Sequence, residues 1–95
     1  MEKLVTVLKA FPFEERPYQD KNGNPQVFAS RKFILSDGID SFVAEMQGDL
    51  ARANKDMQYD LSQAHSAQLQ ITVHPWKDAQ GVDRYSNEIK IIKLS

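Results

Sequence analysis

The chain has 95 residues and a mass of 10.9 kDa, a length that encloses a single core and excludes a two-domain enzyme. Hydrophobic residues make up 41% and charged residues 26% of the sequence, as in a folded globular domain. Lys and Arg number 12 against 13 Asp and Glu, so the formal charge is −1 and any attraction for polyanions must come from a local patch. We therefore expect one domain over residues 1–95.

The amino-acid inventory also excludes several kinds of site. There is no cysteine, so disulfides, thiolate nucleophiles and cysteine-ligated metals are ruled out. His65 and His74 have no third ligand at a metal-like spacing, and we expect neither a metal nor a cofactor. The first residues lack the apolar run of a signal peptide, and no stretch approaches the roughly 18 apolar residues of a membrane span. We expect a cytoplasmic protein that does not contact membranes.

The first expected strand covers Lys3 to Phe13, where apolar residues occupy both alternating positions. This pattern indicates burial on much of both faces, as for a long strand that bends and serves two parts of a sheet. Residues Glu14 to Pro25 then contain two prolines and the segment Lys21 to Asn24, whose residues tolerate a left-handed backbone. We expect a loop there, with a small hairpin as the alternative.

A second strand is expected over Gln26 to Ser36, with one set of alternating residues directed inward: Val27, Ala29, Phe33 and Leu35. Asp37-Gly38 follows, and this dipeptide is a strong signal for a tight hairpin turn. The third strand, Asp40 to Gln47, should therefore pair antiparallel with the second.

The period of the sequence changes after Asp49. Apolar residues recur at spacings of three and four up to Ala64, which predicts one amphipathic helix over Asp49 to Ala64. Apolar and polar residues then alternate over Gln68 to Trp76, as in a strand with one solvent-exposed face. A polar loop over Lys77 to Asp83 and a final strand over Arg84 to Leu94 complete the chain.

This order of elements predicts a mostly β protein. Five strands with one helix between the third and fourth match the layout of the OB-fold, a five-stranded Greek-key barrel. The alternative is an α+β sandwich with the helix on one face of an open sheet. The expected core residues are Phe33, Leu35, Phe42, Leu69, Ile71, Val73, Ile89 and Ile91.

Four segments carry a resemblance to a known family: Asp20 to Pro25, Phe33 to Met46, Gln68 to Val73 and Asn87 to Leu94. They resemble the nucleic-acid-binding OB domains of single-stranded-DNA-binding and replication proteins, including replicative polymerases, and the anticodon-binding domains of aminoacyl-tRNA synthetases. The resemblance covers nearly the whole chain, although its motifs specify turns and core more than a ligand. It implies a replication accessory role, with ligand lying across the second and third strands between two flanking loops.

Carried onto this sequence, the resemblance implies a groove of aromatic, basic and polar residues: Arg16, Tyr18, Lys21, Phe28, Lys32, Thr72, His74, Trp76, Lys77, Arg84 and Tyr85. Such a groove suits single-stranded nucleic acid, with DNA favoured over RNA. Aromatic rings stack unpaired bases for about 1–3 kcal/mol each, while cations follow the phosphates.

Each of these features has a structural alternative. Phe28 and Trp76 would cap an open end of the barrel, and the cations would be solvated loop charges offset by nearby carboxylates. Asp37 and Asp40 fit a turn better than an acid–base pair, and we expect no catalysis. The alternative function is a protein-interaction or homo-oligomerisation module, which exposed apolar residues such as Ile34, Val43 and Ile92 would favour.

Overall fold

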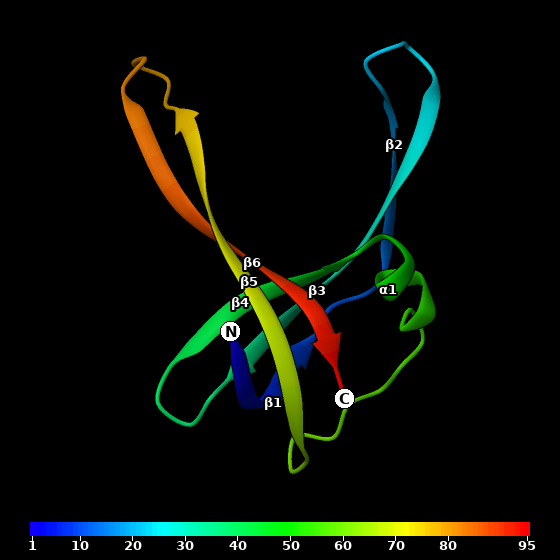
Figure 1. Ribbon diagram of the computed structural model, residues 1–95, viewed down its shortest axis with the longest axis vertical. Helices are drawn as coiled ribbons and strands as arrows, with labels where there is room; N and C mark the ends of the chain where they lie inside the picture. Colours follow the sequence, from blue (N-terminus) through cyan, green and yellow to red (C-terminus); the bar gives the residue numbers. More distant parts are fainter.

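The computed structural model describes residues 1–95 (Figure 1). Most of the chain is β-strand, as expected. The elements in chain order are β1 (Glu2–Ala10), β2 (Glu14–Gln19), β3 (Pro25–Ser36), β4 (Ser41–Gln47), α1 (Gly48–Ala53), β5 (Ala64–Lys77) and β6 (Asp83–Leu94). Helical structure long and apolar enough to cross a membrane is not found.

The strands form one sheet in which five of them close into a ring of hydrogen bonds. Their order is β1-β5-β6-β4-β3-β2, and an additional pairing joins β1 to β3. β1 pairs with β5 through Glu2–Thr6 and with β3 through Thr6–Ala10, with a register shift between Val7 and Lys9. The prediction that the first strand serves two parts of the sheet is thus confirmed.

Ten apolar residues from the ring strands and α1 form the core: Val5, Val7, Phe33, Leu35, Ala44, Met46, Ala51, Ala67, Leu69 and Ile91. Four of the eight expected core residues belong to it, and Phe42 and Ile89 pack against it half-buried. The prediction that β1 is covered on both faces is wrong, because Leu4 and Leu8 are exposed on the side opposite Val5 and Val7.

Two hairpin arms extend beyond the ring (Figure 1). The β2–β3 arm (residues 14–30) pairs Glu14 with Ser30 at its base and Gln19 with Pro25 at its tip. The β5–β6 arm (residues 70–90) pairs Gln70 with Lys90 at its base, and its strands have no other partner further out. The hairpin alternative for residues 14–25 is confirmed, and the sheet has six strands instead of five.

The β5–β6 arm explains two wrong core predictions. Ile71 is 48% exposed and Val73 is 63% exposed. Their alternation with polar residues is real, and they lie on the same side of β5 as the buried Leu69. The strand, however, runs out past the core before it reaches them, so no other element covers this side.

The helix is much shorter than its apolar spacing predicts. α1 ends at Ala53, and the Asn54 side-chain amide donates to the Leu50 carbonyl oxygen at 2.8 Å. The Arg31 guanidinium donates to the carbonyl oxygens of Asn54 at 2.6 Å and Met57 at 2.8 Å. The Asn54 carbonyl also accepts the Met57 backbone N–H at 3.2 Å, a bond across three residues in place of the four that a longer helix would span, so the Arg31 contact accompanies a tight turn after α1. Leu61, one of the apolar residues whose spacing predicts the longer helix, is exposed.

The Asp37-Gly38 turn joins β3 to β4 as predicted. Gly38 has a φ of 94°, a left-handed conformation that glycine adopts without strain. The Asp37 carboxylate accepts the backbone N–H groups of Ile39 and Asp40, and its second oxygen accepts a hydrogen bond from Lys3 Nζ at 2.8 Å. The hydrogen bond from Lys3, together with those backbone bonds, holds the pKa of Asp37 far below its usual range.

Candidate functional site

The strand register defines one continuous face that joins the two arms. Residues paired across neighbouring strands point to the same side of a sheet. Lys32 of β3 is paired with Glu45 of β4, Glu45 with Lys90 of β6, and Lys90 with Gln70 of β5. These four side chains therefore share one side, which we call the groove face, while Ala44 next to Glu45 faces the core.

The groove face extends along both arms because every second residue of a strand shares its side. From Lys32 it follows β3 through Ser30 to Phe28, whose partner on β2 is Arg16. From Gln70 it follows β5 to Trp76, whose partner on β6 is Arg84. By this register the groove face comprises Glu14, Arg16, Tyr18, Gln26, Phe28, Ser30, Lys32, Ile34, Val43, Glu45, Gln47, Gln70, Thr72, His74, Trp76, Arg84, Ser86, Glu88 and Lys90.

The register brings eight of the eleven groove residues expected from sequence onto this face: Arg16, Tyr18, Phe28, Lys32, Thr72, His74, Trp76 and Arg84. Lys21 lies in the turn at the tip of the β2–β3 arm. Lys77 and Tyr85 point to the opposite side of the β5–β6 arm, because each is one residue out of phase with Trp76 and Arg84.

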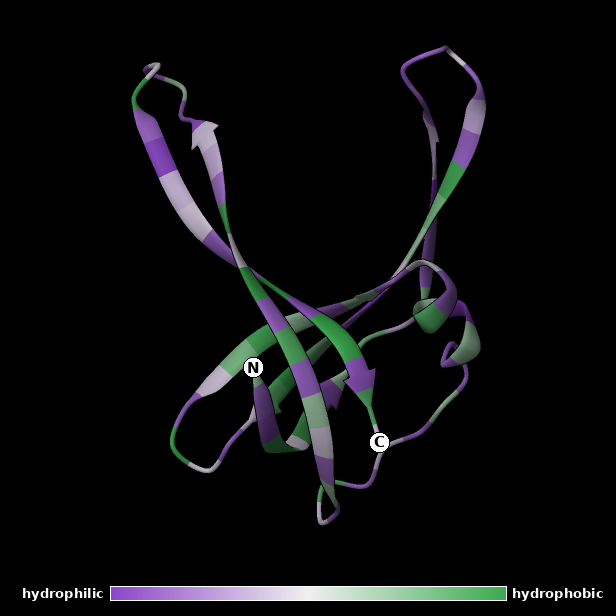
Figure 2. Cartoon of the chain, in the orientation of Figure 1, coloured by the Kyte–Doolittle hydropathy of each residue, from purple (hydrophilic) through white to green (hydrophobic).

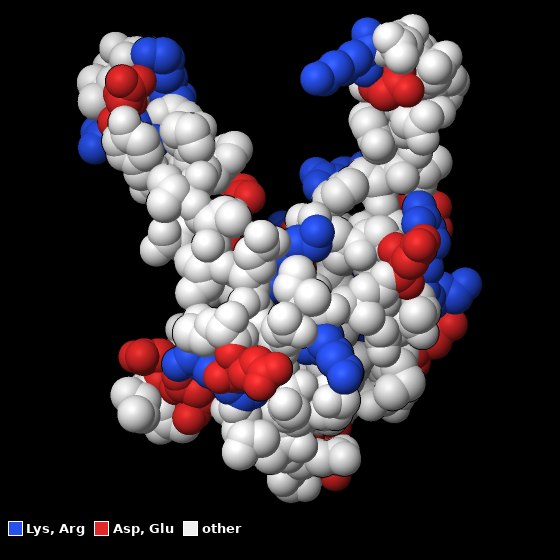
Figure 3. Space-filling model, in the orientation of Figure 1, with Lys and Arg blue, Asp and Glu red and all other residues white.

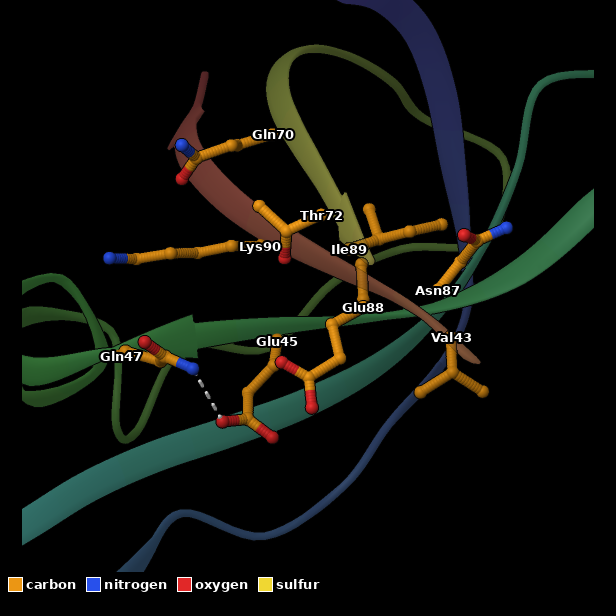
Figure 4. Close-up of a pocket in the computed structure, with 10 residues that line it drawn as sticks. Val43, Glu45, Gln47, Gln70, Thr72, Asn87, Glu88, Ile89 and Lys90 are labelled. Carbon is orange, nitrogen blue, oxygen red and sulfur yellow. Dashed lines mark hydrogen bonds between the residues drawn. The ribbon is translucent and has the colours of Figure 1, made fainter. Parts of the chain in front are cut away.

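A hollow of about 330 Å³ forms the floor between the arms (Figure 4). It is lined by Val43, Ala44, Glu45, Gln47, Gln70, Thr72, Asn87, Glu88, Ile89 and Lys90. The Gln47 side-chain amide donates to Glu45 Oε1 at 3.1 Å, and Lys90 extends between Gln47 and Gln70. The floor contains no aromatic ring, so its chemistry is hydrogen bonding and charge.

Aromatic surface lies instead on the two arms. On the β2–β3 arm the Arg16 guanidinium carbon is 5.7 Å from the centroid of the Phe28 ring, and both residues line a shallow concavity with Pro17 and Tyr18. On the β5–β6 arm Trp76 is 45% exposed. Trp76 thus offers an exposed ring on one arm and Phe28 a half-buried ring beneath Arg16 on the other, and another planar group can stack on such rings.

The positive charge of the groove face comes from residues near its centre and on the β2–β3 arm. Arg16, Lys32 and Lys90 form no ion pair. Lys77 pairs with Asp83 at 2.9 Å and Arg84 with Asp78 at 3.0 Å, so their charges are largely offset. Figure 3 shows Lys and Arg interspersed with Asp and Glu over this view of the molecule.

Lys90 is the main groove residue that sequence reasoning missed. The signal was present, because Lys90 and Glu88 share the alternating position of Arg84 in the last strand. The parallel pairing of Glu45 with Lys90 is what brings that position beside Lys32, and such long-range register is not visible in the sequence.

Other chemistry on this face is limited. Nδ1 of His74 lies 3.7 Å from a Glu88 carboxylate oxygen. No three His, Asp or Glu side chains are grouped to hold a metal ion. Comparison with known proteins assigns no family, since no family model and no curated protein matches the chain.

Proposed function

We propose that the groove face binds single-stranded nucleic acid without catalysing a reaction. The observation that carries this proposal is the order of side chains along the face. An aromatic ring on each arm, the half-buried Phe28 and the exposed Trp76, flanks the unpaired ammonium groups of Lys32 and Lys90. Stacking platforms combined with cations along a groove are the usual means of holding a single strand.

A single strand fits this arrangement better than a duplex. Stacking requires a base whose ring surface is free, and the bases of a duplex are already stacked on their neighbours. The ring-free floor between the arms would accommodate the sugar–phosphate backbone, with bases stacked at either end. A strand bound in this way would occupy a site within the 4–16 nucleotides typical of one such domain.

The connectivity supports the fold that the sequence resemblance implied, and we infer an OB-type barrel. The closed ring consists of β1, β3, β4, β5 and β6, with α1 between its third and fourth strands. In OB-folds the ligand lies across the second and third ring strands and the adjoining loops. Those strands are β3 and β4 here, and the arms occupy the places of the two flanking loops.

The charge of the groove face sets the expected strength of binding. Three unpaired cations face the ligand, while three carboxylates on the same surface, Glu14, Glu45 and Glu88, repel phosphates. Three neutralised phosphates give a slope of about −2 in a plot of log affinity against log salt for a single strand. We therefore expect moderate affinity that is lost as salt rises.

The test is fluorescence anisotropy of labelled 15-nucleotide dT and rU strands at low salt. Phe28→Ala and Trp76→Ala should each weaken binding by about 5- to 150-fold, the loss expected for one stacked base. Val27→Ala is the matched control, because Val27 lies next to Phe28 but points to the opposite side of the arm. No binding by the wild type, or equal losses in all three variants, would refute the proposal.

A further inference from the structure

The β5–β6 arm has a second face, opposite the groove face, that is apolar and uncovered. Its base is the buried pair Leu69 and Ile91. The same side continues outward through three pairs: Ile71 with Ile89, Val73 with Asn87, and Pro75 with Tyr85. We call the exposed residues Ile71, Val73, Pro75 and Tyr85 the apolar arm face.

Beyond their cross-strand neighbours within the arm, the side chains of this face are covered by no other element of the chain. Tyr85 is 70% exposed, in addition to the exposed Ile71 and Val73. The alternation of apolar and polar residues along β5 is visible in Figure 2. The only charged residues at the outer end of this side are Lys77 and Asp83, which form an ion pair with each other. Covering the face would therefore bury no unpaired charge.

An uncovered arm of this kind needs a partner surface. A two-stranded hairpin alone is marginally stable in water, and three strands or an apolar contact are normally required. The outer part of the β5–β6 arm has neither a third strand nor a covering helix. A contact on the apolar arm face would supply what the hairpin lacks.

The total surface of the chain is larger than that of a compact monomer. The chain exposes 6884 Å², whereas a compact monomer of its mass exposes about 5,600 Å². Its radius of gyration is 15.2 Å, against about 12 Å for a compact chain of this length. The excess, on the order of 1,300 Å², belongs to the two arms together, and it leaves the chain with more uncovered surface than the ~800 Å² that each partner buries in a standard interface.

We propose that a second copy of this chain covers the apolar arm face, in a dimer with twofold symmetry. In such a dimer the same patch serves both partners, so an apolar patch free of unpaired charge is complementary to itself. Because the net charge of the chain is −1, electrostatic repulsion between two copies is small. Because the groove face lies on the other side of the arm, both groove faces stay uncovered.

The test is the mass of the full chain in solution, measured by light scattering after size-exclusion chromatography. Protein concentrations of about 10 to 100 µM cover dimers of moderate affinity. The wild type should have twice the monomer mass of 10.9 kDa. Val73→Lys should halve that mass. Ile39→Lys is the matched control, because Ile39 is 92% exposed in the β3–β4 turn, and it should remain dimeric.

A second pair of variants decides the question even if Val73→Lys does not fold. Since the chain has no cysteine, Val73→Cys and Ile39→Cys each introduce a single thiol. A short bismaleimide should cross-link Val73→Cys into dimers and leave Ile39→Cys monomeric on a denaturing gel. A monomeric wild type, a dimeric Val73→Lys, or equal cross-linking of the two cysteine variants would overturn the proposal.

Discussion

Glu45 of β4 lies opposite Lys90 of β6, and this is the only register pair that joins the two parallel strands. The pair closes the ring and fixes the alternation of β6 relative to that of β3 and β4. As a result, the aromatic residues of the two arms face the same side of one sheet. It also places a carboxylate next to the cations of the groove face.

Removing carboxylates from the floor of the groove should strengthen nucleic-acid binding. Glu45 and Glu88 line the hollow between the arms, where their negative charge would repel the phosphates of a strand bound as proposed. We expect the double variant Glu45→Gln, Glu88→Gln to bind a dT strand about 3- to 10-fold more tightly at low salt, with the difference shrinking as salt screens the charges. Gln has nearly the size of Glu, so the comparison isolates the effect of the negative charge. Binding titrations of the wild type and the double variant at several salt concentrations measure it. Unchanged affinity at the lowest salt would place the phosphates elsewhere.

Arg31 should be important for stability. It is 8% exposed, and its guanidinium donates to three backbone carbonyls, those of Phe11, Asn54 and Met57. Arg31→Met would leave these oxygens without their charged donor, and we expect a loss of about 2–4 kcal/mol in the free energy of unfolding by urea. Arg31→Lys should recover only part of it, because an ammonium cannot reproduce the planar fork.

Tyr59 provides a spectroscopic check on the same contact. Burial raises the pKa of Tyr59, and the nearby positive charge of Arg31 partly offsets this rise. Arg31→Met should therefore raise the Tyr59 pKa further, as measured by ultraviolet absorbance during an alkaline titration. A lower Tyr59 pKa in a folded variant would show that Arg31 does not act on the phenol.

The Lys3–Asp37 contact predicts a specific pH dependence of stability. The folded-state pKa of Asp37 is lowered from 3.8 and that of Lys3 is raised from 10.5. The stabilisation is thus present above the ordinary pKa of Asp37, is lost as pH falls below it, and is lost again as pH rises through the folded-state pKa of Lys3. Asp37→Asn keeps the turn acceptor but removes the charge, so its melting temperature should fall below that of the wild type near pH 7.

The same variant should converge with the wild type in acid. Below pH 3.8 the charge advantage of Asp37 fades progressively, and the two melting curves should approach each other. Thermal melts from pH 7 to pH 2 measure this directly. A constant difference across that range would mean that the ion pair contributes nothing and that the turn alone matters.

Core substitutions should separate the ring from the arms. Phe33 is completely buried between Arg31 and Tyr59, and Phe33→Ala should cost about 3–5 kcal/mol. Ile71→Ala should cost less than about 1 kcal/mol in the monomer, because the side chain is half-exposed and leaves no cavity. Urea denaturation at low protein concentration measures both. A loss at Ile71 as large as that at Phe33 would place the outer arm inside the core.

Local signals in the sequence predicted the ring well. Alternation located β3, β4, β5 and β6 to within a few residues, and Asp37-Gly38 located the hairpin between β3 and β4. Strands and tight turns depend on residues adjacent in the sequence, so local backbone preferences are sufficient to predict them. The spacing of apolar residues after Asp49 predicted a helix that is too long. Arg31, distant in sequence, donates hydrogen bonds to the Asn54 and Met57 carbonyls, which a longer helix would use.

The exposure of the arms could not be predicted in the same way. Ile71 and Val73 have the alternation of a core strand, but burial depends on whether another element lies over them. For the candidate site, sequence identified the residue types and the two flanking segments, residues 14–25 and 77–83, that form the outer parts of the arms. The sharing of one face by Trp76 and Phe28 depends on the Glu45–Lys90 register, which only the folded chain reveals.

The most direct measurement uses Trp76, the single tryptophan, as the reporter of its own contact. Titration of the protein at low salt with a dT strand of about 15 nucleotides, within the size of one such site, should quench the Trp76 fluorescence, because a stacked base lies on the indole. A blunt duplex of the same length should quench it much less, and added salt should restore the emission. Absence of quenching and of any mobility shift at tens of micromolar protein would contradict nucleic-acid binding by the groove face.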